Sequence, residues 1–174
     1  RGKDEDINRE MQEALLSSKK DDAELAMIVD LERNDLGRVC NYNTVKVTEK
    51  KKLEPHPTVY HLVATVEGEL HSRYDAIDLI KATFPGGSIT GAPKVRAMQI
   101  IDELEPNKRS TYTGSMGYLS FNGNIDLNIA IRTFLVKEDH IFFQVGGRIV
   151  ADSNPEDEYQ ETLHKARALI ETLE

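Results

Sequence analysis

The sequence of 174 residues contains a single cysteine, Cys40, so no disulfide can form within the chain. Cysteine this scarce fits a reducing compartment, which predicts a cytoplasmic protein and a core-packing role for Cys40. No apolar run approaches the length needed to cross a membrane, and no signal peptide is present. Internal repeats, linkers and low-complexity tracts are lacking too, so we expect one domain over residues 1–174.

Positively charged residues are fewer than negatively charged ones. The chain has 22 Lys and Arg against 30 Asp and Glu, which gives a net charge of −8. Sequence-independent binding of nucleic acid needs a basic surface, so this balance argues against it. A hydrophobic content of 39% with 30% charged residues is typical of a globular protein with a substantial core. We therefore expect neither a nucleic acid nor a membrane as a partner.

One glycine-rich stretch dominates the middle of the chain. Residues 84–98 read Phe-Pro-Gly-Gly-Ser-Ile-Thr-Gly-Ala-Pro-Lys-Val-Arg-Ala-Met. Residues 85–87 interrupt regular structure, and Pro93 suits the first turn of a helix that ends near Glu105-Pro106. The backbone N–H groups at such a helix start favour an anion, and the alternative is a turn that only reverses the chain. A nucleotide P-loop is excluded, because Lys94 lacks the flanking Gly and Ser/Thr of that motif.

Periodicity and capping signals predict a mixed fold. Helices are expected over residues 4–18, from Asp21 or Asp22 as the cap to 36, over 75–83, and over 156–173 after Asn154-Pro155. Strands are expected over 39–48, 59–70 and 140–150, with a hairpin of 112–121 and 125–136 around Asn122-Gly123-Asn124. The lysines at 50–52 fit a solvated turn. The expected fold class is α+β, a mostly antiparallel β-sheet with helices packed on one side.

Two strands carry residues suited to ligand contact. Alternation places Ile129 and Ile131 on the core face of the second hairpin strand and Arg132 on the polar face. Arg132 would there either pair with Asp126 or grip a carboxylate in a cleft. Paired glycines at 146–147 weaken a strand unless something must approach its backbone closely.

Carboxylates form two pairs on two expected helices, Asp21 with Glu24 and Glu158 with Glu161. Taken separately, the first pair fits a helix dipole and Glu161 fits a surface pair with Lys165. Taken together, oxygen ligands without histidine or cysteine suit a hard cation such as Mg²⁺, which would also relieve repulsion between facing pairs. A lone histidine in an apolar strand, as at His61, is more often a hydrogen-bonded core residue than a catalyst.

The glycine-rich stretch resembles the Pro-Gly-Gly-Ser-Ile-Thr-Gly-Ala-Pro-Lys signature of chorismate-utilising enzymes. These comprise the anthranilate, aminodeoxychorismate (para-aminobenzoate), isochorismate and salicylate synthases. Gly-Gly-Ser-Ile-Thr looks more like aminodeoxychorismate synthase component I, because anthranilate synthases more often read Ala-Gly-Thr-Leu/Val-Ser. The segments Ala-Glu-Leu-Ala-Met-Ile-Val-Asp-Leu-Glu-Arg-Asn-Asp-Leu, with Glu24, and Glu-Tyr-Gln-Glu-Thr, with Glu161, resemble the two magnesium-ligand segments. The implied fold is part of a larger two-sheet chorismate-binding sandwich.

The resemblance also implies a role for each candidate residue. Glu24 and Glu161 would hold Mg²⁺ directly, Asp21 and Glu158 would support its water shell, and the ion would bind the ring carboxylate of chorismate. By the same resemblance, His61 would protonate or orient the departing C4 hydroxyl, and Ser88 would position substrate and nucleophile. Tyr112 and Arg132, with Lys165 nearby, would bind the enolpyruvyl carboxylate. Gly146 and Gly147 would contact the substrate through their backbone.

Arg148 departs from the family pattern, which usually has another glycine there. Its side chain would crowd the carboxylate site, or its backbone N–H would still serve. The pair Arg1-Gly2 resembles one that closes a family segment just upstream. We therefore expect a C-terminal portion of a longer enzyme, because the catalytic glutamate and the lysine of Pro-Ile-Lys-Gly-Thr would lie before Arg1. Such a chain would show little or no turnover and would self-associate through exposed apolar surface.

The implied parent reaction aminates chorismate with ammonia to 4-amino-4-deoxychorismate, for para-aminobenzoate and folate synthesis. A glutamine amidotransferase subunit would supply the ammonia. The alternative reaction is that of anthranilate synthase component I in tryptophan synthesis, which aminates C2 and then eliminates pyruvate. A non-catalytic fragment of the same fold is the alternative from another class.

Overall fold

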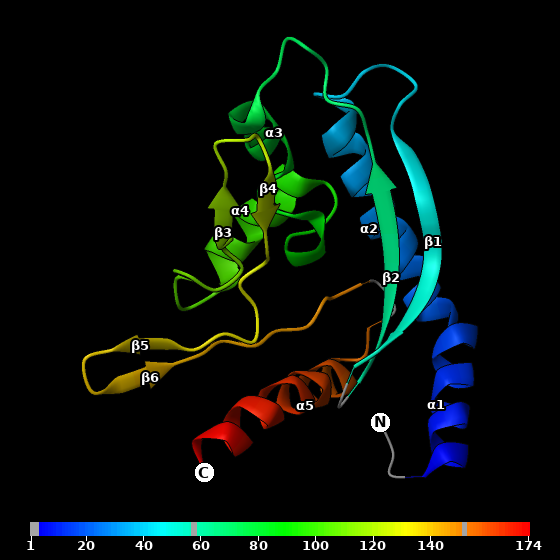
Figure 1. Cartoon of the computed structure of the whole chain (residues 1–174). Coiled ribbons are helices and arrows are strands. Elements are labelled where there is room, and N and C mark those ends of the chain that lie inside the picture. Colours follow the sequence, from blue (N-terminus) through cyan, green and yellow to red (C-terminus); the bar gives the residue numbers. More distant parts are fainter. Residues whose placement is uncertain (1–3, 57–58, 151–152) are drawn as a thin grey trace. The chain divides into compact units, whose positions relative to one another are not determined.

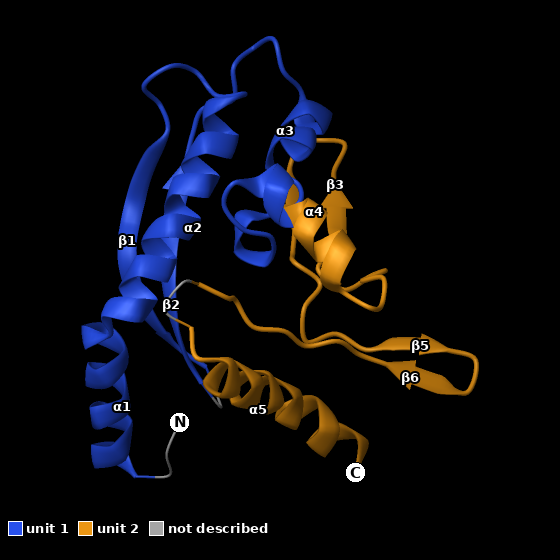
Figure 2. Cartoon of the chain, turned by 180° about the vertical axis from the view of Figure 1, so that it is seen from behind, with its two compact units in different colours: residues 1–97 blue, residues 98–174 orange. Residues whose placement is uncertain are grey.

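Helix α2 (Lys19–Gly37) is the element around which the first half of the chain is built (Figure 1). The computed structural model describes residues 4–56, 59–150 and 153–174. The chain divides into two compact units, residues 1–97 and 98–174, which Figure 2 distinguishes by colour. Within the first unit, α2 contacts β2, α3 and η1.

The two N-terminal helices lie where the periodicity predicts them. Helix α1 (Glu5–Ser17) begins at the cap Asp4, and α2 follows after Ser18. The expectation that Asp21 or Asp22 caps the second helix is wrong, because the Ser18 hydroxyl oxygen accepts the Asp21 N–H at 3.2 Å. A serine here satisfies a free backbone donor as well as an aspartate would, and it lets α2 start one turn earlier.

Strands β1 (Lys46–Pro55) and β2 (Tyr60–Glu67) form a two-stranded antiparallel sheet beside α2 (Figure 1). The strand expected over 59–70 is thus confirmed with a shorter end. The strand expected over 39–48 is displaced, because the chain turns at Asn41–Thr44, where the Thr44 N–H donates to the Asn41 carbonyl at 3.2 Å. The lysines at 50–52 belong to β1 and not to a turn, and Lys51 reaches Asp22 and the carbonyl of Leu16.

A short helix and the glycine-rich loop complete the first unit. Helix α3 (Ala76–Thr83) starts with a capping box in which Asp75 accepts the N–H groups of Ile77 and Asp78. The loop then contains one 3₁₀ turn, η1 (Gly87–Ile89), before helix α4 (Lys94–Leu104). Both helices confirm the sequence prediction. Pro93 stands just before α4, and its carbonyl accepts the N–H of Ala97 at 3.0 Å.

The second unit contains two β-hairpins and the C-terminal helix. Strands β3 (Gly117–Leu119) and β4 (Ile125–Leu127) pair around the predicted turn, where Gly123 has φ of 90°. Strands β5 (Leu135–Lys137) and β6 (His140–Phe142) form the second hairpin. Helix α5 (Pro155–Leu173) starts at Asn154, whose side chain accepts two backbone N–H groups. The hairpin and this helix are confirmed, but all of these strands are shorter than predicted.

The alternation expected along the second hairpin strand stops at Leu127. Beyond it Ala130 is buried, whereas Ile129 and Ile131 are exposed, so the predicted core face is wrong there. The reason is local backbone geometry, because Ala130 exchanges backbone hydrogen bonds with Thr113 and Gly114 outside any regular strand. Arg132 then takes φ of 51°, which ends the extended conformation.

The fold class is confirmed as a mixture of helices and antiparallel sheets. The described strands form three separate two-stranded sheets in place of one larger sheet. Fully buried apolar side chains are few among the described residues: Val39 and Ala82 in the first unit, and Ala130, Ala166 and Leu169 in the second. The described part of the chain holds no helix long and apolar enough to span a membrane.

Candidate functional site

Four of the predicted site residues meet in the second unit. Lys165 on α5 donates to Glu161 at 2.5 Å and to the carbonyl oxygen of Gly146 at 3.3 Å. A Cβ on Gly146 would lie 3.1 Å from the hydroxyl oxygen of Tyr112, so the phenol approaches this backbone closely. An ammonium, a phenol and an open stretch of backbone are thus collected at one place, as a site for a carboxylate requires.

The neighbouring glycine lies against a buried carboxylate. A Cβ on Gly147 would be 3.2 Å from Glu158 Oε2, and Glu158 is 4% exposed. The hydroxyl of Ser153 donates to Glu158 at 2.6 Å. A buried carboxylate held by a hydrogen bond is well oriented, and the missing side chain at Gly147 lets its second oxygen pack against the backbone.

Tyr112 is held in place by a charged pair on the preceding turn. Arg109 forms two hydrogen bonds with Glu105, at 2.9 and 2.6 Å, and its guanidinium lies 5.8 Å from the centre of the Tyr112 ring. Burial raises the pKa of the Tyr112 hydroxyl, while Arg109 acts in the opposite direction. The phenol therefore stays protonated at neutral pH and acts as a hydrogen-bond donor. The sequence prediction did not include Arg109, although Glu105 and Arg109 stand at i and i+4.

Arg132 is not brought into this group by any contact seen among the described residues. It is exposed and takes a left-handed backbone conformation. Its predicted pairing with a substrate carboxylate, or with Asp126, stays a prediction. Arg148 is half-buried, and its predicted effect on the carboxylate site beside Gly146 and Gly147 is likewise still a prediction.

In the first unit, Asp21 and Glu24 lie on one side of α2. Both are partly buried, and Lys20 Nζ lies 4.0 Å from Glu24 Oε1. His61 lies in β2, and its ring centroid is 4.8 Å from that of His56. Ser88 is exposed in η1. These residues lie on three different elements of the unit, and their joint role stays a prediction.

The glycine-rich loop is attached to α2 by residues that the sequence prediction did not select. Glu32 accepts the N–H of Gly87 at 3.3 Å, and Asp35 pairs with Lys94. Burial raises the pKa of Glu32, an effect that Asp35 strengthens and that the Gly87 N–H and Lys94 oppose. Glu32 and Asp35 stand at i and i+3 on α2, a spacing that puts both on the face toward the loop. That spacing was the available signal.

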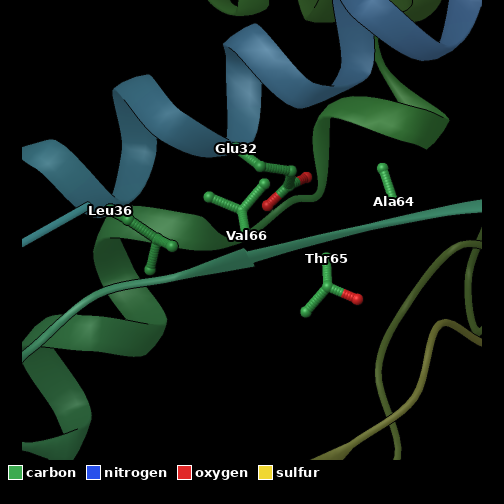
Figure 3. A pocket seen from close by; sticks show the side chains of 5 residues that line it. All are labelled: Glu32, Leu36, Ala64, Thr65 and Val66. Carbon is green, nitrogen blue, oxygen red and sulfur yellow. The ribbon is translucent and has the colours of Figure 1, made fainter. Parts of the chain in front are cut away.

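A pocket of about 390 Å³ lies between α2 and β2 (Figure 3). Its lining comprises Glu32, Leu36, Ala64, Thr65 and Val66. Figure 3 shows Ala64 and Val66 on the side of β2 that faces α2, with Thr65 on the other side. His61 shares the face of Thr65, because side chains alternate along a strand. The predicted catalytic residue His61 is not among the residues that line this pocket.

The donor chemistry of the two carboxylate pairs fits Mg²⁺, because all four groups supply oxygen only. One pair belongs to each unit. Over the described residues, no group of three or more His, Cys, Asp and Glu side chains is arranged to hold a metal ion. A magnesium site formed by both carboxylate pairs together thus remains a prediction. Arg1-Gly2, which resembles the family's upstream pair, lies outside the described residues.

Comparison with known proteins gives one family. Residues 1–171 match a family profile described as chorismate binding enzyme. The chain is 56% identical over 160 residues to aminodeoxychorismate synthase component 1 of Escherichia coli, and covers 35% of it. It is 51% identical over 174 residues to anthranilate synthase component 1 of Aquifex aeolicus, again covering 35%. The chain thus spans about a third of the length of such relatives.

Solved structures agree with this fold. Anthranilate synthase component I of Streptococcus pneumoniae matches with a TM-score of 0.86 and 45% identity, over 93% of this chain and 37% of that chain. The menaquinone-specific isochorismate synthase of Escherichia coli matches with a TM-score of 0.88 and 25% identity, over 99% of this chain and 39% of that chain.

Proposed function

The chain belongs to the family of chorismate-binding enzymes, and from this premise we propose that it is the chorismate-binding portion of an aminodeoxychorismate synthase component I. The observation that carries the proposal is the group formed by Tyr112, Gly146, Glu161 and Lys165. A phenol and an ammonium beside an open glycine backbone offer donors to a carboxylate. Chorismate carries two carboxylates, so these donors suit it.

Each predicted residue has a defined task in this proposal. Lys165, Tyr112 and Arg132 bind the enolpyruvyl carboxylate, and the N–H groups of Gly146 and Gly147 reach the substrate. His61 protonates or orients the departing hydroxyl, and Ser88 positions substrate and nucleophile. Glu24 and Glu161, with Asp21 and Glu158 around them, would hold Mg²⁺, which when bound polarises the ring carboxylate.

The preference for amination at C4 rests on Gly86-Gly87-Ser88-Ile89-Thr90, which resembles the aminodeoxychorismate synthase form of the loop. Anthranilate synthesis is the second candidate, supported by 51% identity over the whole chain to an anthranilate synthase component. In either case a glutamine amidotransferase subunit is the proposed source of ammonia, and folate or tryptophan synthesis the proposed pathway. The product decides between the two candidates.

Calorimetric titration of the purified chain with chorismate tests the proposal. We expect binding in the presence of MgCl₂ and its loss with EDTA. Lys165→Met should weaken binding about tenfold or more, because a charge-assisted hydrogen bond is lost. Lys108→Met removes an exposed lysine and is the matched control. Magnesium-independent or absent binding by the wild-type chain would refute the proposal.

Mass spectrometry of reactions with ammonia identifies the product. 4-Amino-4-deoxychorismate supports the first candidate, while anthranilate with pyruvate supports the second. We expect turnover by this chain alone to be low or absent. Fusion to a segment that carries Pro-Ile-Lys-Gly-Thr, which the family resemblance implies as the source of the nucleophile, should raise turnover.

A further inference from the structure

The ends of the glycine-rich loop, residues 84–93, are joined by one side chain. Lys94 follows the loop directly, and its Nζ lies 3.4 Å from the carbonyl oxygen of Thr83, the residue that precedes the loop. The same Nζ is paired with Asp35 on α2. The Lys94 ammonium therefore joins the two ends of the loop, which we call the closed stem. It also attaches the loop to α2 through Asp35, which lies 59 residues earlier in the sequence.

This ion pair is more shielded from water than the exposed ion pairs seen among the described residues. The side chain of Asp35 is 2% exposed and that of Lys94 is 15% exposed. The pair of Lys108 with Asp102 has the same chemistry, but its side chains are 85% and 74% exposed. A buried carboxylate without its partner is strongly unfavourable, so the Asp35 charge holds Lys94 in place. Arg38 lies farther from Asp35, at 3.8 Å, and is itself exposed.

The loop has a second attachment to the same helix. The N–H of Gly87 donates to Glu32, and the Gly87 backbone packs so closely on Leu31 that an added Cβ would lie 2.8 Å from the Leu31 Cβ. Ser88 is the next residue of the loop. Its backbone is thus held between an attachment one residue away and the closed stem at Lys94.

We propose that Asp35 and Lys94 are positioning residues, which hold the glycine-rich loop so that Ser88 is presented to chorismate. The inference rests on the proposed function for the identity of the ligand, but not for the positioning itself. Neither residue touches the substrate. They act through the ends of the loop. The predicted metal ligand Glu24 also lies on α2, so the same helix supports both this ligand and the loop.

An ion pair that merely stabilises the fold would give a different result from one that positions the loop. A buried pair can often be replaced by apolar residues of similar size without loss of stability. The double variant Asp35→Val with Lys94→Met should therefore melt near the wild-type temperature. It cannot restore the bond from Lys94 to Thr83, so amide hydrogen exchange at residues 84–93 should become about tenfold faster or more. Exchange in α3 should stay at the wild-type rate.

The double variant Asp102→Val with Lys108→Met is the matched control, and exchange in the loop should not change in it. Wild-type exchange rates for residues 84–93 in the Asp35→Val/Lys94→Met variant would overturn the proposal. Chorismate affinity, measured beside exchange, should fall in this variant and not in the control. If the wild-type chain binds no chorismate, the proposed function fails, whereas the exchange result still decides the positioning role.

A measurement on the wild-type chain needs no variant to fold. In a chain with ¹⁵N-labelled lysine, the Lys94 ammonium should give an NMR signal that exchanges slowly with water, because its protons are bonded to Asp35 and Thr83. Lys108 should give no such signal, because its pair is exposed. Rapid exchange of every lysine ammonium would refute the closed stem.

Discussion

At Glu32, burial and neighbouring charges act on a carboxyl that also binds the glycine-rich loop. Burial raises its pKa above the ordinary value of 4.5, and the nearby Asp35 adds to this, while the Gly87 N–H and Lys94 oppose it. The folded chain therefore holds this proton more tightly than the unfolded chain. The contribution of Glu32 to the free energy of unfolding falls as pH rises from 4.5 through the raised folded pKa.

Glu32→Gln should remove this contribution, because an amide does not titrate. The free energy of unfolding of the variant, minus that of the wild type, should increase from pH 4.5 upward and then level off. Urea denaturation at a series of pH values measures it. Glu103→Gln, at an exposed position of α4, controls for the loss of one negative charge. A difference that stays constant over the whole pH range would contradict the assignment.

Single residues with a strong local motif were predictable from the sequence, and residues that act through partners were not. The glycines at 146–147 pointed to close backbone approach, and Tyr112 and Glu158 do approach them. Asp35 and Lys94 lie 59 residues apart, and nothing local indicates their pairing. The i, i+3 spacing of Glu32 and Asp35 indicates a shared helix face, but the bond from Glu32 to Gly87 depends on tertiary contacts that the spacing does not show.

At the scale of elements, the contact of η1 with α2 is tight enough to test by one methyl group. A Cβ on Gly87 would lie 2.8 and 2.9 Å from the Cβ and Cδ1 of Leu31. Gly87→Ala should therefore lower the free energy of unfolding by about 1–3 kcal/mol, the usual cost of overpacking. Chemical denaturation with the midpoint followed by circular dichroism measures the change.

Gly37→Ala is the matched control, because a Cβ there would meet nothing within 4 Å at the end of α2. It should be neutral or stabilising by up to about 1 kcal/mol, since alanine restricts the unfolded chain more than glycine does. Leu31→Ala removes the contact with Cδ1 but keeps the contact with Cβ, so combining it with Gly87→Ala should cost somewhat less than the sum of the single changes. Full additivity would show that the two side chains do not meet.

Helices were predicted far better than strands. Helix signals are local, as in the cap at Asn154 and the capping box at Asp75, and the observed helices agree with them. Strand ends depend on pairing partners, so β1 is displaced toward Pro55 and β6 ends at Phe142. Alternation beyond Leu127 failed for the same reason, because backbone bonds to Thr113 and Gly114 decide the position of Ala130.

At the scale of the whole molecule, many large apolar side chains remain in contact with water. Val95 and Leu104 on α4 are 70% and 71% exposed. We expect the chain to self-associate, so that sedimentation velocity gives an average mass that rises above 19.6 kDa with concentration. Added salt should strengthen association by screening the net charge of −8. A mass of 19.6 kDa at every concentration would contradict this expectation.

The fold class and the family could be predicted from motifs that extend over most of the chain. The magnesium site stays a prediction, because its two proposed carboxylate pairs belong to two compact units. Convergence of such pairs depends on long-range packing and on a bound ion, neither of which a residue pattern encodes. The residues that meet around Lys165 were named from the sequence, and the structure brings them together because they all lie in one unit.

The bond from Lys94 to Thr83 has a consequence for what substitutions the chain tolerates. Because Lys94 joins the two ends of the loop, the number of residues between them determines where Ser88 lies. Adding or deleting a residue between positions 84 and 93 would therefore move Ser88 relative to these ends, even if every glycine were kept. A segment that replaces residues 84–93 should therefore have the same number of residues, which matters more than having the same composition.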